Sequence, residues 1–170
     1  MLTFKNFLSE ITDKPAELIW KLKSEKYLKA IATIGERKIL FSLGRWPQHT
    51  ADIAKNITNY GLTFSELDED DEDDGTYDAT GSGNEFQVFA TVKAFLLECL
   101  KIAQPSAIHF EADKTSYSFR TSRQSRVSLY KKFGKRWHPD GYHFELIANT
   151  EESEYFAYVK DGVKISKDYD

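Results

Sequence analysis

The first half of the chain alternates apolar and polar residues, which is the pattern of strands with one buried face. Strands are expected at 18–22, 28–34, 39–43, 62–67 and 76–80. Between Phe4 and Ile11 the apolar residues instead recur every three or four positions, so an amphipathic helix is predicted within residues 1–14. A second short helix is predicted at 50–57.

After Gly83 the apolar period becomes that of a helix. The apolar stripe runs from Phe86 to Leu100, with Asn84 placed to cap its start and Pro105 beyond its end. A further helix is predicted at 125–137, and further strands at 107–112, 142–146 and 155–159. A strand, a helix and a second strand in this order form a crossover, which makes the two strands parallel. The predicted class is therefore α+β, a mixed and mostly antiparallel sheet with helices packed on it.

The length of 170 residues favours one domain over 1–170, and a hydrophobic share of 41% is enough for a packed core. A membrane span needs about 18 consecutive apolar residues, and no such run occurs. The first twenty residues lack the order of a secretory signal, so we expect a cytoplasmic protein without a membrane partner. The single cysteine, Cys99, argues against disulfides and cysteine-based zinc clusters, and no metal is expected.

Charge is concentrated in one short segment. Eight of the nine residues from Glu66 to Asp74 are acidic, and without them the formal net charge of −4 becomes +4. Such a run repels itself, so a solvated acidic loop is predicted at 65–75. Its acidic residues do not follow the order of a calcium-binding loop. The last residues, 161–170, are predicted to be a polar tail.

The segment between Asp113 and Asp140 is basic and contains no acidic residue. Clustered fixed cations attract polyanions, so this segment is a candidate for binding nucleic acid or another anion. A solvated helix face is the alternative interpretation. The candidate anion-binding residues are Arg123, Arg126, Lys131 and Lys132.

A glycine-containing turn connects the fifth predicted strand to the long helix. It contains Gly81, Ser82, Gly83 and Asn84. Two glycines let the backbone turn tightly, and the start of a helix adds partial positive charge, which together suit a phosphate or pyrophosphate. A plain turn is the alternative. The sequence lacks the third glycine of the dinucleotide pattern and the Gly-Lys-Ser/Thr of the P-loop.

The second half of the chain resembles the GNAT superfamily of acyl-CoA-dependent N-acyltransferases. Members of that family carry a pyrophosphate loop of the form Gln/Arg-x-x-Gly-x-Gly/Ala before a long helix, and a Leu-Tyr-x-x-x-Gly element on a later helix. Asp78-Ala79-Thr80-Gly81-Ser82-Gly83 has the loop spacing, and Leu129-Tyr130-Lys131-Lys132-Phe133-Gly134 has the later element. The resemblance covers roughly residues 60 to 150.

The resemblance implies acetyl-CoA or another acyl-CoA as the cofactor and an amine as the acceptor. The amides of Ser82, Gly83 and Asn84 would then bind the pyrophosphate, and Tyr130 would protonate the departing thiolate. A phenol, with an ordinary pKa of about 10, is a suitable donor to a thiolate. A tyrosine packed on the apolar helix face is the alternative reading of Tyr130.

A base is also needed to accept the proton of the amine. Glu111 and His109 lie two residues apart, on one face of the predicted strand at 107–112, and Glu111 is the candidate base. A surface pair without a catalytic role is the alternative.

A second resemblance links the opening Phe4-Lys5-Asn6-Phe7-Leu8-Ser9-Glu10, Gly81-Ser82-Gly83 and Ser125-Arg126-Val127-Ser128-Leu129-Tyr130 to small uncharacterised proteins of tailed bacteriophages. It implies a location in the cytoplasm of an infected bacterial cell or in a virion. Two functions remain open on the sequence: an acyl-CoA N-acyltransferase or a catalytically lapsed relative, and a non-catalytic phage module that binds nucleic acid or a protein through its basic helix.

Overall fold

A computed structural model describes residues 14–46, 52, 55–68, 71–76, 85–114 and 123–167. The helix predicted at 1–14 and the strand residues 77–80 lie outside these ranges, apart from Lys14. Most of the helix predicted at 50–57 also lies outside them. Asp52 is helical, and residues 55–56 form a turn.

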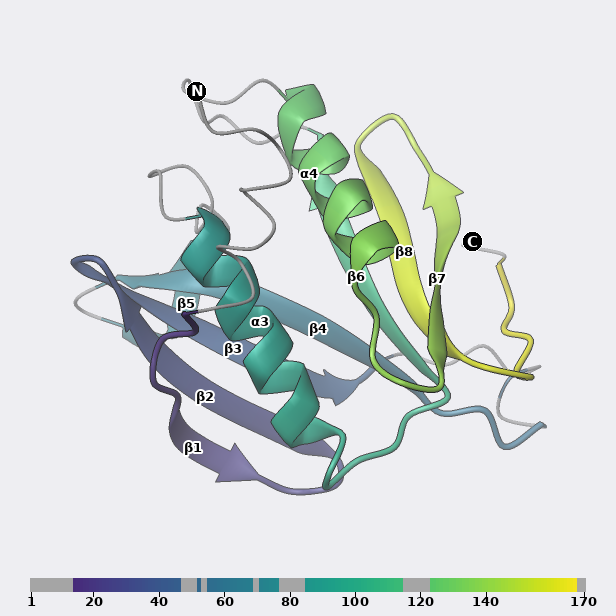
Figure 1. The fold of residues 1–170 in the computed structure, drawn as a ribbon, viewed down its shortest axis with the longest axis horizontal. Coiled ribbons are helices and arrows are strands. Elements are labelled where there is room, and N and C mark those ends of the chain that lie inside the picture. The colour runs from purple at the N-terminus through teal and green to yellow at the C-terminus, as the bar shows by residue number, and fades with distance from the viewer. Residues whose placement is uncertain are drawn as a thin grey trace. The chain divides into compact units, whose positions relative to one another are not determined.

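The described residues form eight strands and two helices (Figure 1). The strands are β1 (Ile19–Lys23), β2 (Tyr27–Ile34), β3 (Arg37–Arg45), β4 (Asn59–Asp68), β5 (Asp71–Thr76), β6 (Ala107–Asp113), β7 (Tyr142–Asn149) and β8 (Ser153–Lys160). The helices are α3 (Glu85–Cys99) and α4 (Arg123–Arg136). Apart from a fifth strand that begins five residues earlier than expected, the predicted strands and the two later helices are confirmed to within a few residues.

The strands are hydrogen-bonded in the order β1-β2-β3-β4-β6-β8-β7, and β5 pairs with β4. The β1–β2, β4–β5, β6–β8 and β7–β8 pairs are antiparallel, whereas β4 and β6 are parallel. The predicted class is therefore confirmed as a mixed, mostly antiparallel sheet with helices.

The sheet contains one parallel pair, as the sequence predicts, but it joins β6 to β4 and not to β5, the strand directly before α3, which pairs antiparallel with β4. Asn59, Tyr60 and Gly61 lie opposite residues 107–109. Just before this register, Thr58 and Ser106 exchange hydrogen bonds between backbone and side chain, with the Thr58 N–H donating to Ser106 Oγ at 3.0 Å. The start of the parallel pairing is thus fixed by side chains as well as by the strands.

The chain divides into two compact units. Unit 1 comprises residues 1–43 and 63–103, and unit 2 comprises residues 44–62 and 104–170. The first residues of β4 belong to unit 2 and its remaining residues to unit 1.

In unit 1 the apolar stripe of α3 packs against the strands. Phe95 is fully buried, and its ring stacks on Trp20 at 5.4 Å and contacts Phe41 at 5.9 Å. Phe89 meets Phe64 of β4 edge to face at 6.3 Å. The predicted helix stripe is therefore the stripe that builds this core.

In unit 2 the helix α4 lies beside the strands β6, β8 and β7 (Figure 1), and aromatic side chains of these strands pack against one another. Phe110, Phe144, Phe156 and Tyr158 contact one another with ring centroids 5.4–6.1 Å apart. Trp137, directly after α4, meets Tyr158 at 5.9 Å. These contacts place α4 on the face of the β6-β8-β7 strands that carries these rings.

The acidic segment differs from the predicted loop at 65–75. β4 extends to Asp68, and β5 begins at Asp71 and pairs with it, with Leu67 opposite Gly75. Strand pairing supplies backbone hydrogen bonds, and Arg37 forms an ion pair with Glu66 that offsets one of the negative charges. The acidic residues therefore lie largely in a two-stranded hairpin.

Candidate functional site

The predicted pyrophosphate residues Gly81, Ser82, Gly83 and Asn84 lie outside the described residues. The structure does describe the helix that follows them, because α3 begins at Glu85. The first N–H groups of a helix have no partner within the helix and carry partial positive charge. The four residues thus directly precede a helix start, as the sequence predicts.

Tyr130 lies within α4, and its side chain is half-buried. The final glycine of the same motif, Gly134, has a packing role. A Cβ atom at Gly134 would lie 2.2 Å from the ring of Phe144, far inside normal contact. The glycine of the Leu-Tyr-x-x-x-Gly element therefore permits α4 to approach β7 closely.

Glu111, the predicted base, lies on the face of β6 opposite α4. Its exposed carboxylate accepts a hydrogen bond from Ser153 Oγ on the neighbouring strand. Phe110, one residue earlier, points to the face covered by α4, and successive strand residues point to opposite faces. The structure therefore does not bring Glu111 together with the helix that carries Tyr130.

Tyr155, opposite Glu111 in the strand register, is affected by this carboxylate. Partial burial raises the pKa of the Tyr155 phenol, and the nearby charge of Glu111 and a hydrogen bond with it raise it further. Glu111, Ser153 and Tyr155 thus form a small polar cluster on the face opposite α4.

The four candidate anion-binding residues do not share one environment. Lys131 Nζ lies 2.8 Å from Glu154 Oε2, and the Glu154 side chain is only 7% exposed. Lys131 therefore already pairs with a carboxylate of the protein itself. Lys132 is exposed, and the side chains of Arg123 and Arg126 lie outside the described part of the structure.

A buried polar network that the sequence reading missed lies in unit 2. Asn59 Nδ2 donates to Asp52 Oδ2 at 3.0 Å, so the amide oxygen of Asn59 faces His109 Nε2, 3.2 Å away. His109 must then donate from Nε2. Trp46 stacks on the His109 ring at 6.0 Å, and all three polar residues are at least 95% buried.

This network explains His109 without catalysis. The pair His109 and Glu111 is not a surface pair, because His109 is 5% exposed whereas Glu111 is exposed. Asp52 also accepts a hydrogen bond from the backbone N–H of Ser166 at 3.1 Å. A buried carboxylate needs such donors, and here they join segments far apart in the sequence.

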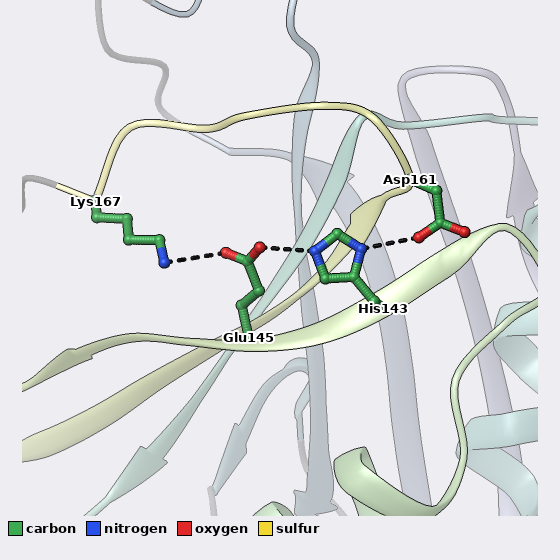
Figure 2. A network of polar contacts seen from close by, with 4 residues as sticks. All are labelled: His143, Glu145, Asp161 and Lys167. Atoms are coloured by element: carbon green, nitrogen blue, oxygen red, sulfur yellow. Dashed lines mark hydrogen bonds and ion pairs between the residues drawn. The ribbon is translucent and has the colours of Figure 1, made fainter.

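A second network that the sequence reading missed lies around His143 on β7 (Figure 2). His143 Nε2 lies 2.7 Å from Glu145 Oε1, and His143 Nδ1 lies 2.9 Å from Asp161 Oδ1. Lys167 Nζ lies 3.2 Å from the other oxygen of Glu145. The signal in the sequence was the His-x-Glu spacing, because residues 143 and 145 share one face of a strand.

Within the described ranges, no group of three or more His, Cys, Asp or Glu side chains is arranged to bind a metal ion. Neither α3 nor α4 is long and apolar enough to cross a membrane. Burial raises the pKa of the Cys99 thiol to about 12, so this thiol is a poor nucleophile.

The chain matches no protein-family model, no curated protein and no solved structure. A function therefore has to be argued from the residues and their geometry.

Proposed function

We propose that this protein binds acyl-CoA and transfers the acyl group to an amine, or descends from such a transferase and keeps its coenzyme site. In this proposal the amides of Ser82, Gly83 and Asn84 bind the pyrophosphate. The Tyr130 hydroxyl donates a proton to the departing thiolate.

The observation that carries the proposal is the parallel pairing of β4 with β6. In the GNAT resemblance a strand leads through the pyrophosphate loop and a long helix to the next strand. The chain has this order of elements, with β5 before Gly81-Ser82-Gly83-Asn84, α3 directly after them and β6 next, although the strand parallel to β6 is β4 and not β5. The Leu129–Gly134 motif lies in α4, which supports the proposal for the later element, and the glycine-containing motif precedes α3 in the sequence.

Glu111 is the weakest member of the proposed set. It lies on the strand face opposite α4 and is already bonded to Ser153. A role for Glu111 as the base would therefore be shown by slower acyl transfer in Glu111→Gln. Coenzyme binding and the role of Tyr130 are independent of it.

Coenzyme binding can be tested by thermal shift with millimolar acetyl-CoA or coenzyme A, because a ligand that binds only the folded state raises its melting temperature. We expect both ligands to stabilise the chain. Ser82→Asp should abolish the shift, since it places a carboxylate beside the pyrophosphate. Ser24→Asp, in the exposed β1–β2 turn, adds the same charge elsewhere and should keep the shift.

Asp78 provides a second variant, in which coenzyme binding is expected to become stronger. It stands where the family usually has Gln or Arg, and a carboxylate there repels the pyrophosphate. Asp78→Gln should therefore strengthen coenzyme binding. No shift with either ligand, in the wild type and in Asp78→Gln, would contradict the proposal.

Catalysis is tested separately, by release of the coenzyme A thiol from acetyl-CoA in the presence of primary amines. Tyr130→Phe should lower turnover and leave the thermal shift intact, because it removes the proton donor alone. Binding without any turnover in the wild type would identify the lapsed relative.

The exposed cations of α4 favour one alternative, a module that binds nucleic acid. Lys132, Lys135 and Arg136 are exposed, although Lys131 is bound to Glu154. This alternative predicts binding to DNA or RNA that weakens steeply with salt. Replacing Arg123, Arg126, Lys132 and Lys135 by Gln should abolish it, whereas Lys21→Gln with Lys26→Gln should not.

A further inference from the structure

The C-terminal residues 161–167, here called the C-terminal strap, lie within the segment predicted as a polar tail, and their two apolar side chains are partly buried. Val163 and Ile165 pack against a buried apolar cluster of the β6-β8-β7 strands. This cluster consists of Ala107, Ile147, Ala157 and Val159. The strap thus covers the part of the strand face opposite α4 where these residues lie.

Backbone hydrogen bonds hold the strap at several points. The Asp161 N–H donates to the Gly141 carbonyl at 2.8 Å, and the Val163 N–H donates to the Lys160 carbonyl at 3.0 Å. The Ser166 N–H donates to Asp52 Oδ1 at 3.1 Å. No histidine atom takes part in these bonds, so their amides can report how firmly the strap is held.

The remaining ties of the strap pass through His143 and Glu145 (Figure 2). Asp161, at the start of the strap, contacts one ring nitrogen of His143, and Glu145 contacts the other. Lys167, at the end of the strap, contacts the second oxygen of Glu145. One network of two positive and two negative groups therefore fastens both ends of the strap.

The geometry requires His143 to be protonated. A carboxylate only accepts hydrogen bonds, and a neutral imidazole has only one N–H to donate. With a carboxylate oxygen within 3 Å of each ring nitrogen, both contacts are hydrogen bonds only in the imidazolium form. Loss of the proton leaves a nitrogen lone pair facing a carboxylate and gives the network a net negative charge.

We propose that the C-terminal strap is a pH-sensitive fastening, held over its apolar cluster by protonated His143 and loosened when His143 loses its proton. The charged groups that face His143 are Glu145 on its own strand and Asp161 on the strap, and Lys167 acts through Glu145. The His143 side chain is 44% exposed, so protons can reach the ring from solvent.

The direction of the pH dependence follows from the shift of the histidine. Hydrogen bonds to Glu145 and then to Asp161 raise the pKa of His143 above its ordinary 6.5, against a smaller opposing effect of burial. The contribution of His143 is therefore complete below about pH 6.5 and is lost as the pH rises through the raised pKa of the folded state. The strap should loosen above that point.

Amide hydrogen exchange of the full chain tests this proposal, with NMR titration of the histidines from pH 5.5 to 8.5. Protection of the Val163 and Ser166 amides, corrected for intrinsic exchange, should fall roughly two- to fivefold across the titration of His143, which is the range expected for exposed ion pairs. The Tyr158 amide in β8 serves as the internal reference and should keep its protection.

The matched variants are His143→Gln and His138→Gln. His143→Gln should show low strap protection at every pH, whereas His138→Gln should behave as the wild type, because His138 lies outside the network and contacts the Pro139 carbonyl. The proposal is overturned if His143 titrates at or below 6.5, if strap protection does not change with pH, or if its change persists in His143→Gln.

Discussion

At the scale of single residues, the attachment of α4 to its strands depends on two contacts in the proposed motif segment. Lys131 meets the buried carboxylate of Glu154, and Gly134 lets the ring of Phe144 approach the helix backbone. Neither contact follows from the apolar period of the helix, which predicts one face made of Leu129, Tyr130, Phe133 and Trp137.

Lys131→Met should destabilise the fold by about 3 kcal/mol, because it leaves the charge of Glu154 buried without its cation. The measurement is urea unfolding at pH 7. Lys135→Met, on the exposed side of α4, is the control and should change stability by less than about 0.5 kcal/mol. Adding Glu154→Gln to Lys131→Met should restore part of the loss. If Lys131→Met and the control variant Lys135→Met are equally stable, the ion pair of Lys131 with Glu154 does not stabilise the fold.

Gly134→Ala should also destabilise the protein, by about 1–3 kcal/mol, since the new methyl group would overlap the Phe144 ring. Alanine is otherwise the better helix former, so an open site would give the opposite sign. Unfolding of Gly134→Ala in the wild type and in a Phe144→Leu background measures the overlap. A loss of the same size in both backgrounds would mean that the ring is not responsible.

At the scale of elements, α3 is the segment whose sequence pattern and packing agree most closely. Its apolar positions recur at helical spacing, and the structure buries Val88, Val92 and Phe95 on one side while Leu97 stays 44% exposed. The hairpin of β4 and β5 shows the opposite case. The like charges predict a loop, but the structure pairs residues of the acidic segment as strands. The ion pair of Arg37 with Glu66 offsets one of the negative charges.

Phe95→Ala should cost about 3–5 kcal/mol, because it removes a fully buried ring that contacts Trp20 and Phe41. Leu97→Ala is the control on the same helix and should cost far less, since nearly half of that side chain is exposed. Chemical denaturation of both variants provides the comparison. Similar losses would contradict the assigned helix face.

At the scale of the whole molecule, stability should depend on pH through His143. The raised pKa of this histidine makes the folded state bind a proton more tightly than the unfolded chain. Its contribution is therefore present at pH 6 and is lost as the pH rises through the raised value. The exposure of the pair limits the effect to less than about 1 kcal/mol, and salt should reduce it.

The difference in unfolding free energy between the wild type and His143→Gln, followed from pH 6 to 9 at low and high salt, measures this contribution. The wild-type advantage should shrink with rising pH and be smaller at high salt. An advantage that grows with pH would contradict the predicted sign.

The sequence by itself determined the elements and one feature of their topology. Apolar period distinguishes strands from helices because each repeat reflects local backbone geometry, and the strand-helix-strand order around α3 predicted one parallel pair, which the structure forms between β4 and β6 and not between β5 and β6. Local rules of this kind act over a few residues. They placed most of the strands and both later helices, including the helix start after Asn84.

Only the tertiary structure decided which polar side chains meet. Asn59 and His109 are separated by 50 residues, His143 and Asp161 by 18, and Asp52 and Ser166 by 114. Such contacts depend on strand register and on which face each residue occupies, and the period of a single element carries no information about its partner. For the same reason the sequence could name Glu111 and Tyr130 as a pair, whereas the fold places Glu111 on the strand face opposite the helix of Tyr130.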